Sequence, residues 1–365
     1  MKIAMIGQKG IPALYGGVER HVEEVSLRLA KLQNQVFVYT RSYYTSKKLK
    51  KYKKVRLIYL PSFFAKNFDT ITHVFLSSFH AVLRLKPDVI HYHGIGPALC
   101  IWIPKIFNPQ IKVIFTFHCQ DYFHKKWSFI ARFFLKFGEK MGCLLADEII
   151  AVSPEIKDYI KNKYNKESHF IPHGSSQENI LLPLKIKKWG LEKNNYILVV
   201  SRLIPHKGIH YIIKAYNKIP TAKKLVIVGS SFHTMEYENR LKEMASSNKN
   251  IVFLGNQSGK ILKELYSNAY LFVAPSEQEG MPLSVLEAAS FGRPMLLSDI
   301  KAHRWMFAQN PFFFKSKNVK DLKFNLEFLL RNPQTLSYRA KLTKKYAQKH
   351  YDWDNIVEEI ILKYV

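Results

Sequence analysis

The sequence predicts an α/β protein built from two Rossmann-like domains, each with a doubly wound parallel sheet, that face a cleft. Short apolar segments alternate with longer segments of helical periodicity along the chain, which is typical of parallel sheets covered by helices on both faces. The alternation breaks once, in a polar stretch rich in Lys, Pro and Asn near residues 180–195, and then restarts. The 365 residues suffice for two separate cores. We therefore expect domains at residues 1–178 and 179–350.

The first domain is expected to open with a strand at residues 2–7 and a Gly/Pro-containing loop at residues 8–17. A helix follows, because apolar residues recur at alternating steps of four and three from Val18 to Leu32. Further strands are expected at residues 35–40, 55–60, 89–93, 112–118, 148–152 and 169–171, with helices near 68–85, at 127–145 and from 154.

The second domain repeats this pattern. Strands are expected at residues 196–200, 225–228, 251–254, 270–274 and 295–298, with helices at 208–218, 235–245, 260–268, after Gly280, and in two pieces from 319 to about 351. The final segment, 351–365, is apolar at Trp353, Ile356 and Ile360, so it needs a surface to cover. Ligands of such sheets bind beyond the carboxyl ends of the strands, which is where the candidate residues fall.

The formal net charge of +28 indicates attraction to an anionic partner: nucleic acid, an acidic lipid surface or a phosphorylated substrate. The basic residues are spread over both halves, and the chain has neither an RNP-like aromatic motif nor a helix-turn-helix pattern, so we expect no nucleic acid partner.

Several features favour a cytoplasmic location without bound cofactors. The sequence has no uncharged apolar run of about 18 residues, and we expect its opening residues to form a strand and not a signal peptide. Its three cysteines form no C-x-x-C pair and read as reduced, packed side chains. No metal-ligand spacing occurs, so we expect no metal ion and no other cofactor.

An acidic pair brackets the helix that follows the strand at 270–274. Glu279 precedes the helix and Glu287 lies about two turns inside it, while Gly280 and Pro282 suit the helix start. Free backbone N–H groups there can hold an anion, and the carboxylates can accept hydrogen bonds from sugar hydroxyls, so a nucleotide sugar would fit. The alternative is an ordinary capped helix with acidic residues near its start.

Two cations lie five residues apart between the first strand and first helix of the second domain. Arg202 supplies a planar donor fork and Lys207 a point charge, which together could clamp a diphosphate. Two solvated surface cations are the alternative.

The first domain offers a glycine pair and a strand-end histidine. Gly16 and Gly17 let the backbone approach a phosphate at a helix start, although a tight turn explains them equally. His118 ends a strand and could hydrogen-bond a sugar hydroxyl, although most lone histidines are structural. His91 and His93 are expected to support loops.

A dense basic run reads either as a solvated loop or as a patch that faces an anionic membrane. The run comprises Lys47, Lys48, Lys50, Lys51, Lys53 and Lys54. Tyr43, Tyr44 and Tyr52 could sit at the interface, and Phe63, Phe64 and Phe68 nearby could add apolar insertion.

Taken together, these motifs resemble the family-4 glycosyltransferases, which are retaining enzymes of the two-domain GT-B fold. The resemblance rests on G-I-P-A-L-Y-G-G-V-E-R-H, T-F-H-C-Q-D-Y, I-P-H-G, S-R-L-I-P-H-K-G, E-G-M-P-L-S-V-L-E-A and S-D-I-K-A-H-R, in that order. The opening and the H-x-x-D-Y-x-x-K-K-W stretch resemble bacterial members that build surface polysaccharides, including rhamnosyltransferase-like proteins.

The resemblance implies a nucleoside-diphosphate sugar as donor and a saccharide or lipid-linked acceptor. It assigns His118 and Glu279 to the transferred sugar, Arg202 and Lys207 to the leaving diphosphate, and Glu287 to the ribose. Gly16, Gly17, Gly280, Met281 and Pro282 match donor-binding loops, and segment 351–365 matches a helix that packs back on the first domain. His173 and Cys119 stand where many relatives have Asn and Gly, which bears on the identity of the donor.

Three other readings remain open from the residues alone. A nucleotide-sugar 2-epimerase shares the fold but needs no second substrate. A basic non-catalytic protein that binds nucleic acid or membranes would explain the charge. A non-catalytic assembly subunit would not need the intact Arg202, Lys207, Glu279 and Glu287.

Overall fold

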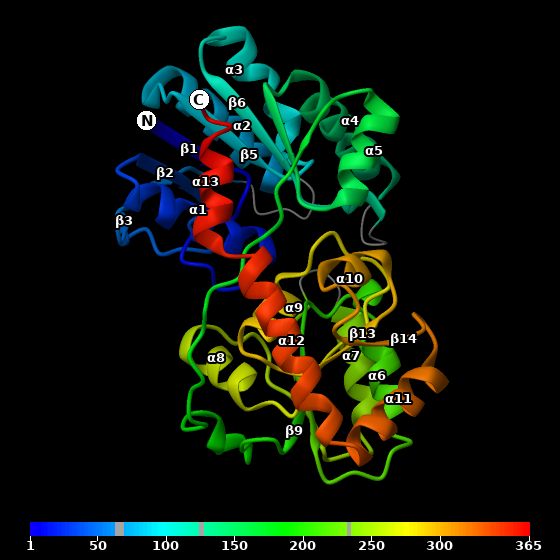
Figure 1. The fold of residues 1–365 in the computed structure, drawn as a ribbon. Coiled ribbons are helices and arrows are strands. Elements are labelled where there is room, and N and C mark those ends of the chain that lie inside the picture. The colour runs from blue at the N-terminus through cyan, green and yellow to red at the C-terminus, as the bar shows by residue number, and fades with distance from the viewer. Residues whose placement is uncertain (63–68, 124–127, 232–234) are drawn as a thin grey trace. The chain divides into compact units, whose positions relative to one another are not determined.

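The computed structural model describes residues 1–62, 69–123, 128–231 and 235–365. The chain divides into two compact units, one formed by residues 1–173 with 353–365 and the other by residues 174–352 (Figure 1). Phe63, Phe64 and Phe68, which the sequence suggested as membrane-inserting residues, lie outside the described residues.

Unit 1 is an eight-stranded sheet in the order β3-β4-β2-β1-β5-β6-β7-β8. Its pairs are parallel except for the edge pair β3–β4. The strands are β1 (Lys2–Ile6), β2 (Gln35–Thr40), β3 (Lys51–Tyr52), β4 (Val55–Tyr59), β5 (Val89–His93), β6 (Lys112–Phe117), β7 (Glu148–Ala151) and β8 (His169–Phe170). The α-helices are α1 (Gly17–Lys31), α2 (Asp69–His80), α3 (Trp102–Phe107), α4 (Phe129–Leu145), α5 (Pro154–Tyr164) and α13 (Trp353–Ile361). The central strands are apolar and buried throughout, because helices cover both of their faces.

Unit 2 is a parallel six-stranded sheet in the order β11-β10-β9-β12-β13-β14. The strands are β9 (Tyr196–Val200), β10 (Lys224–Val228), β11 (Ile251–Phe253), β12 (Leu271–Ala274), β13 (Met295–Ser298) and β14 (Phe312–Phe314). The α-helices are α6 (Ile209–Tyr216), α7 (Met235–Ala245), α8 (Gly259–Asn268), α9 (Leu283–Ser290), α10 (Lys301–Met306), α11 (Val319–Arg331) and α12 (Gln334–His350). Apolar side chains from β9, β10, α6 and α11 form a continuous core. The predicted α/β fold of two parallel-sheet domains is therefore confirmed.

Each sheet has one point where the strand order reverses. In unit 1 the chain winds from β1 towards β2 on one side and continues from β5 on the other; in unit 2 it winds from β9 towards β10 and continues from β12. The loops that leave the carboxyl ends of such adjacent strands diverge and make room for a ligand. Gly16 and Gly17 follow β1, Arg202 and Lys207 follow β9, and Glu279 follows β12.

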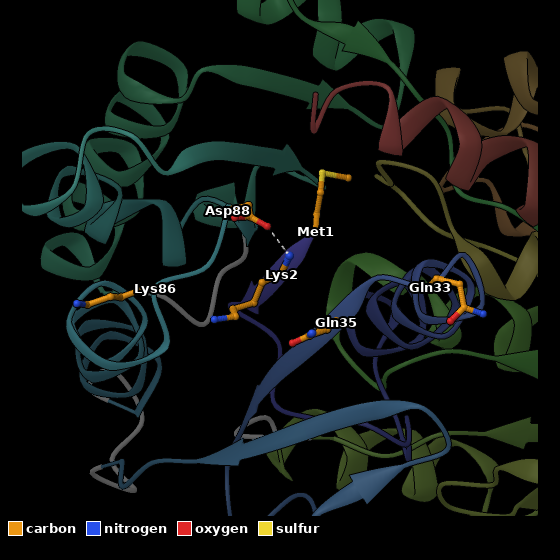
Figure 2. A pocket seen from close by; sticks show the side chains of 6 residues that line it. All are labelled: Met1, Lys2, Gln33, Gln35, Lys86 and Asp88. Carbon is orange, nitrogen blue, oxygen red and sulfur yellow. Dashed lines mark hydrogen bonds between the residues drawn. The ribbon is translucent and has the colours of Figure 1, made fainter.

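A surface pocket lies at the opposite edge of the unit 1 sheet (Figure 2). It is lined by residues at or before the amino ends of strands, including Lys2 and Asp88, and the Lys2 backbone N–H donates to the Asp88 carboxylate at 2.6 Å. Because ligands of doubly wound sheets bind at the carboxyl ends, this pocket is not the candidate site.

The last helix of the chain, α13, packs on α1 within unit 1. Arg28 Nε donates to Asp354 at 2.6 Å, and the Tyr364 hydroxyl lies 2.7 Å from His91 Nδ1. The buried side chains of α13 include Trp353, Ile356 and Ile360, which are the apolar positions noted in the sequence.

Candidate active site

In unit 2 the loops after β9 and β12 touch each other through the backbone. The Glu277 N–H donates to the His206 carbonyl at 2.8 Å. Gly208 has φ +69°, and a Cβ at this position would overlap the Pro275 carbonyl oxygen. Glycine therefore permits both the left-handed turn before α6 and the close approach of the two loops.

This approach joins two of the predicted site residues. Lys207 Nζ lies 2.5 and 2.7 Å from the two carboxylate oxygens of Glu279, and both side chains are largely buried. Burial raises the pKa of Glu279, but the Lys207 ammonium outweighs it, with help from His303 and from the Ser276 hydroxyl, and holds this pKa at about 2. The carboxylate is therefore ionised at neutral pH and keeps Lys207 in a fixed position.

Three residues that the sequence did not single out support this pair. The Ser276 hydroxyl donates to Glu279 at 2.7 Å, and the Ser298 hydroxyl donates to the Ser276 carbonyl at 2.5 Å. His303 Nδ1 lies 2.9 Å from the Ser298 carbonyl, which can only accept, so Nδ1 carries the proton. Burial lowers the pKa of His303. Ser298 and His303 belong to the S-D-I-K-A-H-R motif, which is visible in the sequence. The spacing of the motif does not show which groups these side chains contact.

The other predicted residues of unit 2 surround the same loops. Arg202 is exposed and has no carboxylate partner within the described part of the chain. Met281 is buried and Gly280 is half-buried, whereas Glu287 lies inside α9. Pro282 was expected in the first helical turn; it is instead the N-cap of α9, with ψ 114°, because the helix begins one residue later at Leu283. The first N–H groups of α9 still lack carbonyl partners within the helix.

In unit 1 the glycine pair starts α1. Gly16 is the N-cap with φ +102°, and a Cβ there would overlap the Glu19 carboxylate. Glu19 accepts from the Lys9 N–H at 3.1 Å and Glu23 from the Ala13 N–H at 2.8 Å. The first turns of α1 thus fix the loop that follows β1.

His118 belongs to a buried cluster of histidines. Its ring centroid lies 5.0 Å from that of His21 and 5.2 Å from that of His173, and its Nε2 lies 3.4 Å from Nδ1 of His93. Because His21 lies one turn into α1, the glycine pair and His118 share one edge of the sheet. Burial lowers the pKa of each of these rings, so they are neutral at physiological pH.

The cluster also includes His91, whose Nε2 lies 2.6 Å from the Thr116 hydroxyl. Within the described ranges, His21, His93 and His118 form the one group of metal-ligand type, with ligand atoms within 4.8 Å of one another. The expectation that no metal takes part stays a prediction.

The basic run of residues 47–54 lies around the edge strand β3. All six lysines are exposed. The suggestion that Tyr44 sits at a membrane interface is wrong: its side chain is buried, and its hydroxyl accepts from the Leu14 N–H at 2.8 Å and donates to the Tyr15 carbonyl at 2.7 Å. Tyr52 bonds to Glu23 at 3.1 Å. These tyrosines stabilise the glycine loop and the adjoining helix.

We expect Gly208→Ala to destabilise unit 2 by about 2 kcal/mol or more, because it combines a left-handed backbone with a backbone clash. Gly259→Ala is the matched control, since Gly259 has φ +56° but nothing within 4 Å of its Cβ position, and its cost should be about 1 kcal/mol. Urea unfolding measures both. Equal costs would mean that the β9 and β12 loops are not held together at Gly208.

Each of the two units matches a known protein family. Residues 15–177 match Glycosyltransferase Family 4, and residues 183–350 match Glycosyl transferases group 1. The O-antigen chain mannosyltransferase RfbU of Salmonella typhimurium is 27% identical over 261 residues, which are 71% of this chain and 69% of the relative.

A second relative is the N,N'-diacetylbacillosaminyl-diphospho-undecaprenol alpha-1,3-N-acetylgalactosaminyltransferase of Campylobacter jejuni, which is 26% identical over 64% of each chain. Among solved structures, the Anabaena protein HepE in complex with UDP and glucose superposes with a TM-score of 0.81 at 17% identity, over 99% of this chain and 98% of that one. This last similarity concerns the fold.

No helix within the described ranges combines the length and the apolar character that a membrane span requires. The two family matches together cover nearly the whole sequence, one on each unit. The chain is therefore a glycosyltransferase of family 4, with the GT-B fold.

Proposed function

We propose that the protein transfers a sugar, with retention of anomeric configuration, from a nucleoside-diphosphate sugar to a hydroxyl of a lipid-linked saccharide in bacterial surface polysaccharide assembly. The main support for a nucleoside-diphosphate sugar as substrate is the Lys207–Glu279 pair, which lies at the strand-order reversal of unit 2, beside the start of α9. It places a cation, a carboxylate and backbone donors at the edge where such sheets bind ligands.

The chemistry assigned to these residues is electrostatic. The bond between the anomeric carbon and the diphosphate oxygen breaks, and the acceptor oxygen bonds to the same carbon. Negative charge grows on the diphosphate, and Arg202, Lys207 and the N–H groups at Gly280 and Met281 stabilise it. The departing phosphate oxygen takes the acceptor proton, so no protein general base is assigned.

The remaining residues have binding and positioning roles. Glu279 holds the sugar hydroxyls, Glu287 binds the ribose, and Pro282 shapes the loop before α9. In unit 1, Gly16, Gly17 and His118 contact the donor and the transferred sugar.

The relatives support the substrate classes. RfbU is named for O-antigen chains, the Campylobacter enzyme for an undecaprenol-linked substrate, and the HepE structure contains UDP. We propose a cytoplasmic location, with Lys47, Lys48, Lys50, Lys51, Lys53 and Lys54 facing an anionic inner membrane.

The test begins with a thermal-shift screen against UDP, GDP, dTDP, CDP and ADP sugars, since a ligand of the native state raises the melting temperature. The stabilising donor is then incubated with and without a lipid-linked acceptor. Transfer that requires the acceptor supports the proposal. Epimerised donor in the absence of acceptor would indicate a 2-epimerase instead, and stabilisation by no donor would contradict the function.

We expect transfer to persist after treatment with EDTA, because Arg202, Lys207 and backbone N–H groups supply the charge stabilisation that a divalent ion would otherwise provide. The measurement is the initial rate before and after chelation, with and without added Mg²⁺, Mn²⁺ or Zn²⁺. A rate that is lost on chelation and restored by one of these ions would contradict the metal-free scheme.

A further inference from the structure

Helix α4 presents a row of large apolar side chains to solvent. The exposed fractions are Phe129 87%, Ile130 68%, Phe133 61%, Phe134 43% and Phe137 43%. Residues three and four apart lie on one side of a helix, so these side chains form a continuous strip over more than two turns, which we call the α4 strip. Soluble monomers rarely expose contiguous apolar patches of this kind unless the patch binds something.

The helix cannot turn this strip into the core, because its other side is fixed by glycines. A Cβ at Gly138 would overlap the Ile95 carbonyl oxygen, and one at Gly142 would lie 2.7 Å from the Phe115 ring. Gly138 and Gly142 are four residues apart and both buried. The close packing of these glycines on the segment after β5 and on β6 sets the rotation of α4.

Positive charge lies along the same exposed surface. Arg132, Lys136 and Lys140 are exposed and recur every four residues, next to the apolar strip. The single acidic residue of α4, Glu139, points inward: it is fully buried and accepts from Tyr159 at 2.6 Å and from Lys163 at 2.9 Å. The outward surface of α4 is therefore aromatic and cationic, without a compensating carboxylate from the helix itself.

We infer that the α4 strip is a docking surface for an anionic lipid bilayer. Aromatic and aliphatic side chains enter the boundary between headgroups and acyl chains, while flanking Lys and Arg side chains contact anionic headgroups. The inference deepens the proposed function and rests on it in one respect: an enzyme that acts on a lipid-linked acceptor must work at a membrane surface. The α4 strip is distinct from the lysines of residues 47–54, beside which the side chain of Tyr44 is buried and that of Tyr52 bonds to Glu23.

The test is cosedimentation of the full chain with vesicles of phosphatidylcholine alone or with about one third phosphatidylglycerol. Two triple variants are each expected to weaken binding to anionic vesicles more than about tenfold. One is Phe129→Ser, Phe133→Ser, Phe137→Ser, and the other is Arg132→Glu, Lys136→Glu, Lys140→Glu. Each basic residue contributes about a factor of five to binding near such a surface. Phe324→Ser with Phe328→Ser is the matched control: these residues are 68% and 45% exposed on α11 and also lie four apart, and their replacement should leave binding unchanged.

Circular dichroism should show that the α4 variants still fold and melt cooperatively, because Phe129 and Phe133 are mostly exposed and the basic side chains lie at the surface. Their rate on a water-soluble saccharide acceptor should match wild type, which separates docking from catalysis. The inference is supported if both α4 variants lose vesicle binding and the α11 control variant does not. Wild-type binding by the α4 variants, or a wild-type dimer that becomes monomeric on substitution of the strip, would overturn it. Failure of transfer with intact vesicle binding would refute the proposed function and leave the docking surface standing.

Discussion

Replacement of Lys207 by alanine is expected to lower the rate of sugar transfer by about two to three orders of magnitude, which is the usual loss when one donor to a developing anion is removed. Lys207 is fixed by two contacts with Glu279, at 2.5 and 2.7 Å. In our account its charge is shared between this carboxylate and the diphosphate as that group departs. The measurement is the turnover rate at saturating donor.

The same variant should also be less stable. Without the ammonium, Glu279 stays largely buried with Ser276 and His303 as its remaining partners, and breaking such a pair costs about 3 kcal/mol. The double variant Lys207→Ala, Glu279→Gln removes the unpaired charge and should recover most of this stability without recovering turnover. A folded Lys207→Ala variant with near wild-type turnover would show that the residue has no part in stabilising the leaving group.

Acidification from pH 7 to pH 5 is expected to destabilise unit 1 strongly. Burial lowers the pKa of His91 and of His173 to about 3. Below about pH 6.5 the unfolded chain binds protons that these folded rings do not, so the free energy of unfolding falls as the pH decreases from 6.5 towards 3. At pH 5 the loss is about 2 kcal/mol for each of the two histidines, and His21, His93 and His118 act in the same direction.

Urea unfolding at pH 7 and pH 5 measures this effect. Glu279 does not contribute to the difference between pH 7 and pH 5. The stability that comes from its lowered pKa is fully present above about pH 4.5 and is lost only as the pH falls towards 2. A His173→Asn variant should lose part of the pH dependence, since one of the buried rings is gone. The same unfolding free energy at both pH values would mean that the histidines are hydrated and not packed against one another.

Sequence alone predicted the alternation of strands and helices well, because central parallel strands are continuous apolar segments; β2, β5 and β9 occupy the expected residues. Strand β14 was missed, since three residues are too few to show a period. The motifs also indicated which loops carry charge. They did not reveal that Lys207 and Glu279, which are 72 residues apart, form a pair.

Two other features depend on tertiary packing and so were not predicted. The histidine cluster joins α1, β5, the end of β6 and the segment after β8, and no spacing along the chain relates these residues. In α4, periodicity shows an apolar side but not whether it faces the core. The glycines at 138 and 142 decide that question, because only their side of the helix fits against the sheet.

Calorimetry with the nucleoside diphosphate that stabilises the protein measures whether Arg202 and Lys207 of unit 2 bind the diphosphate. Arg202→Ala should weaken binding more than about tenfold, because hydrogen bonds to charged groups contribute about 1.5–3 kcal/mol, and it should not alter stability, since the side chain is exposed. Lys214→Ala, an exposed cation on α6, is the control and should bind as wild type does. Wild-type affinity in the Arg202→Ala variant would show that Arg202 does not bind the diphosphate.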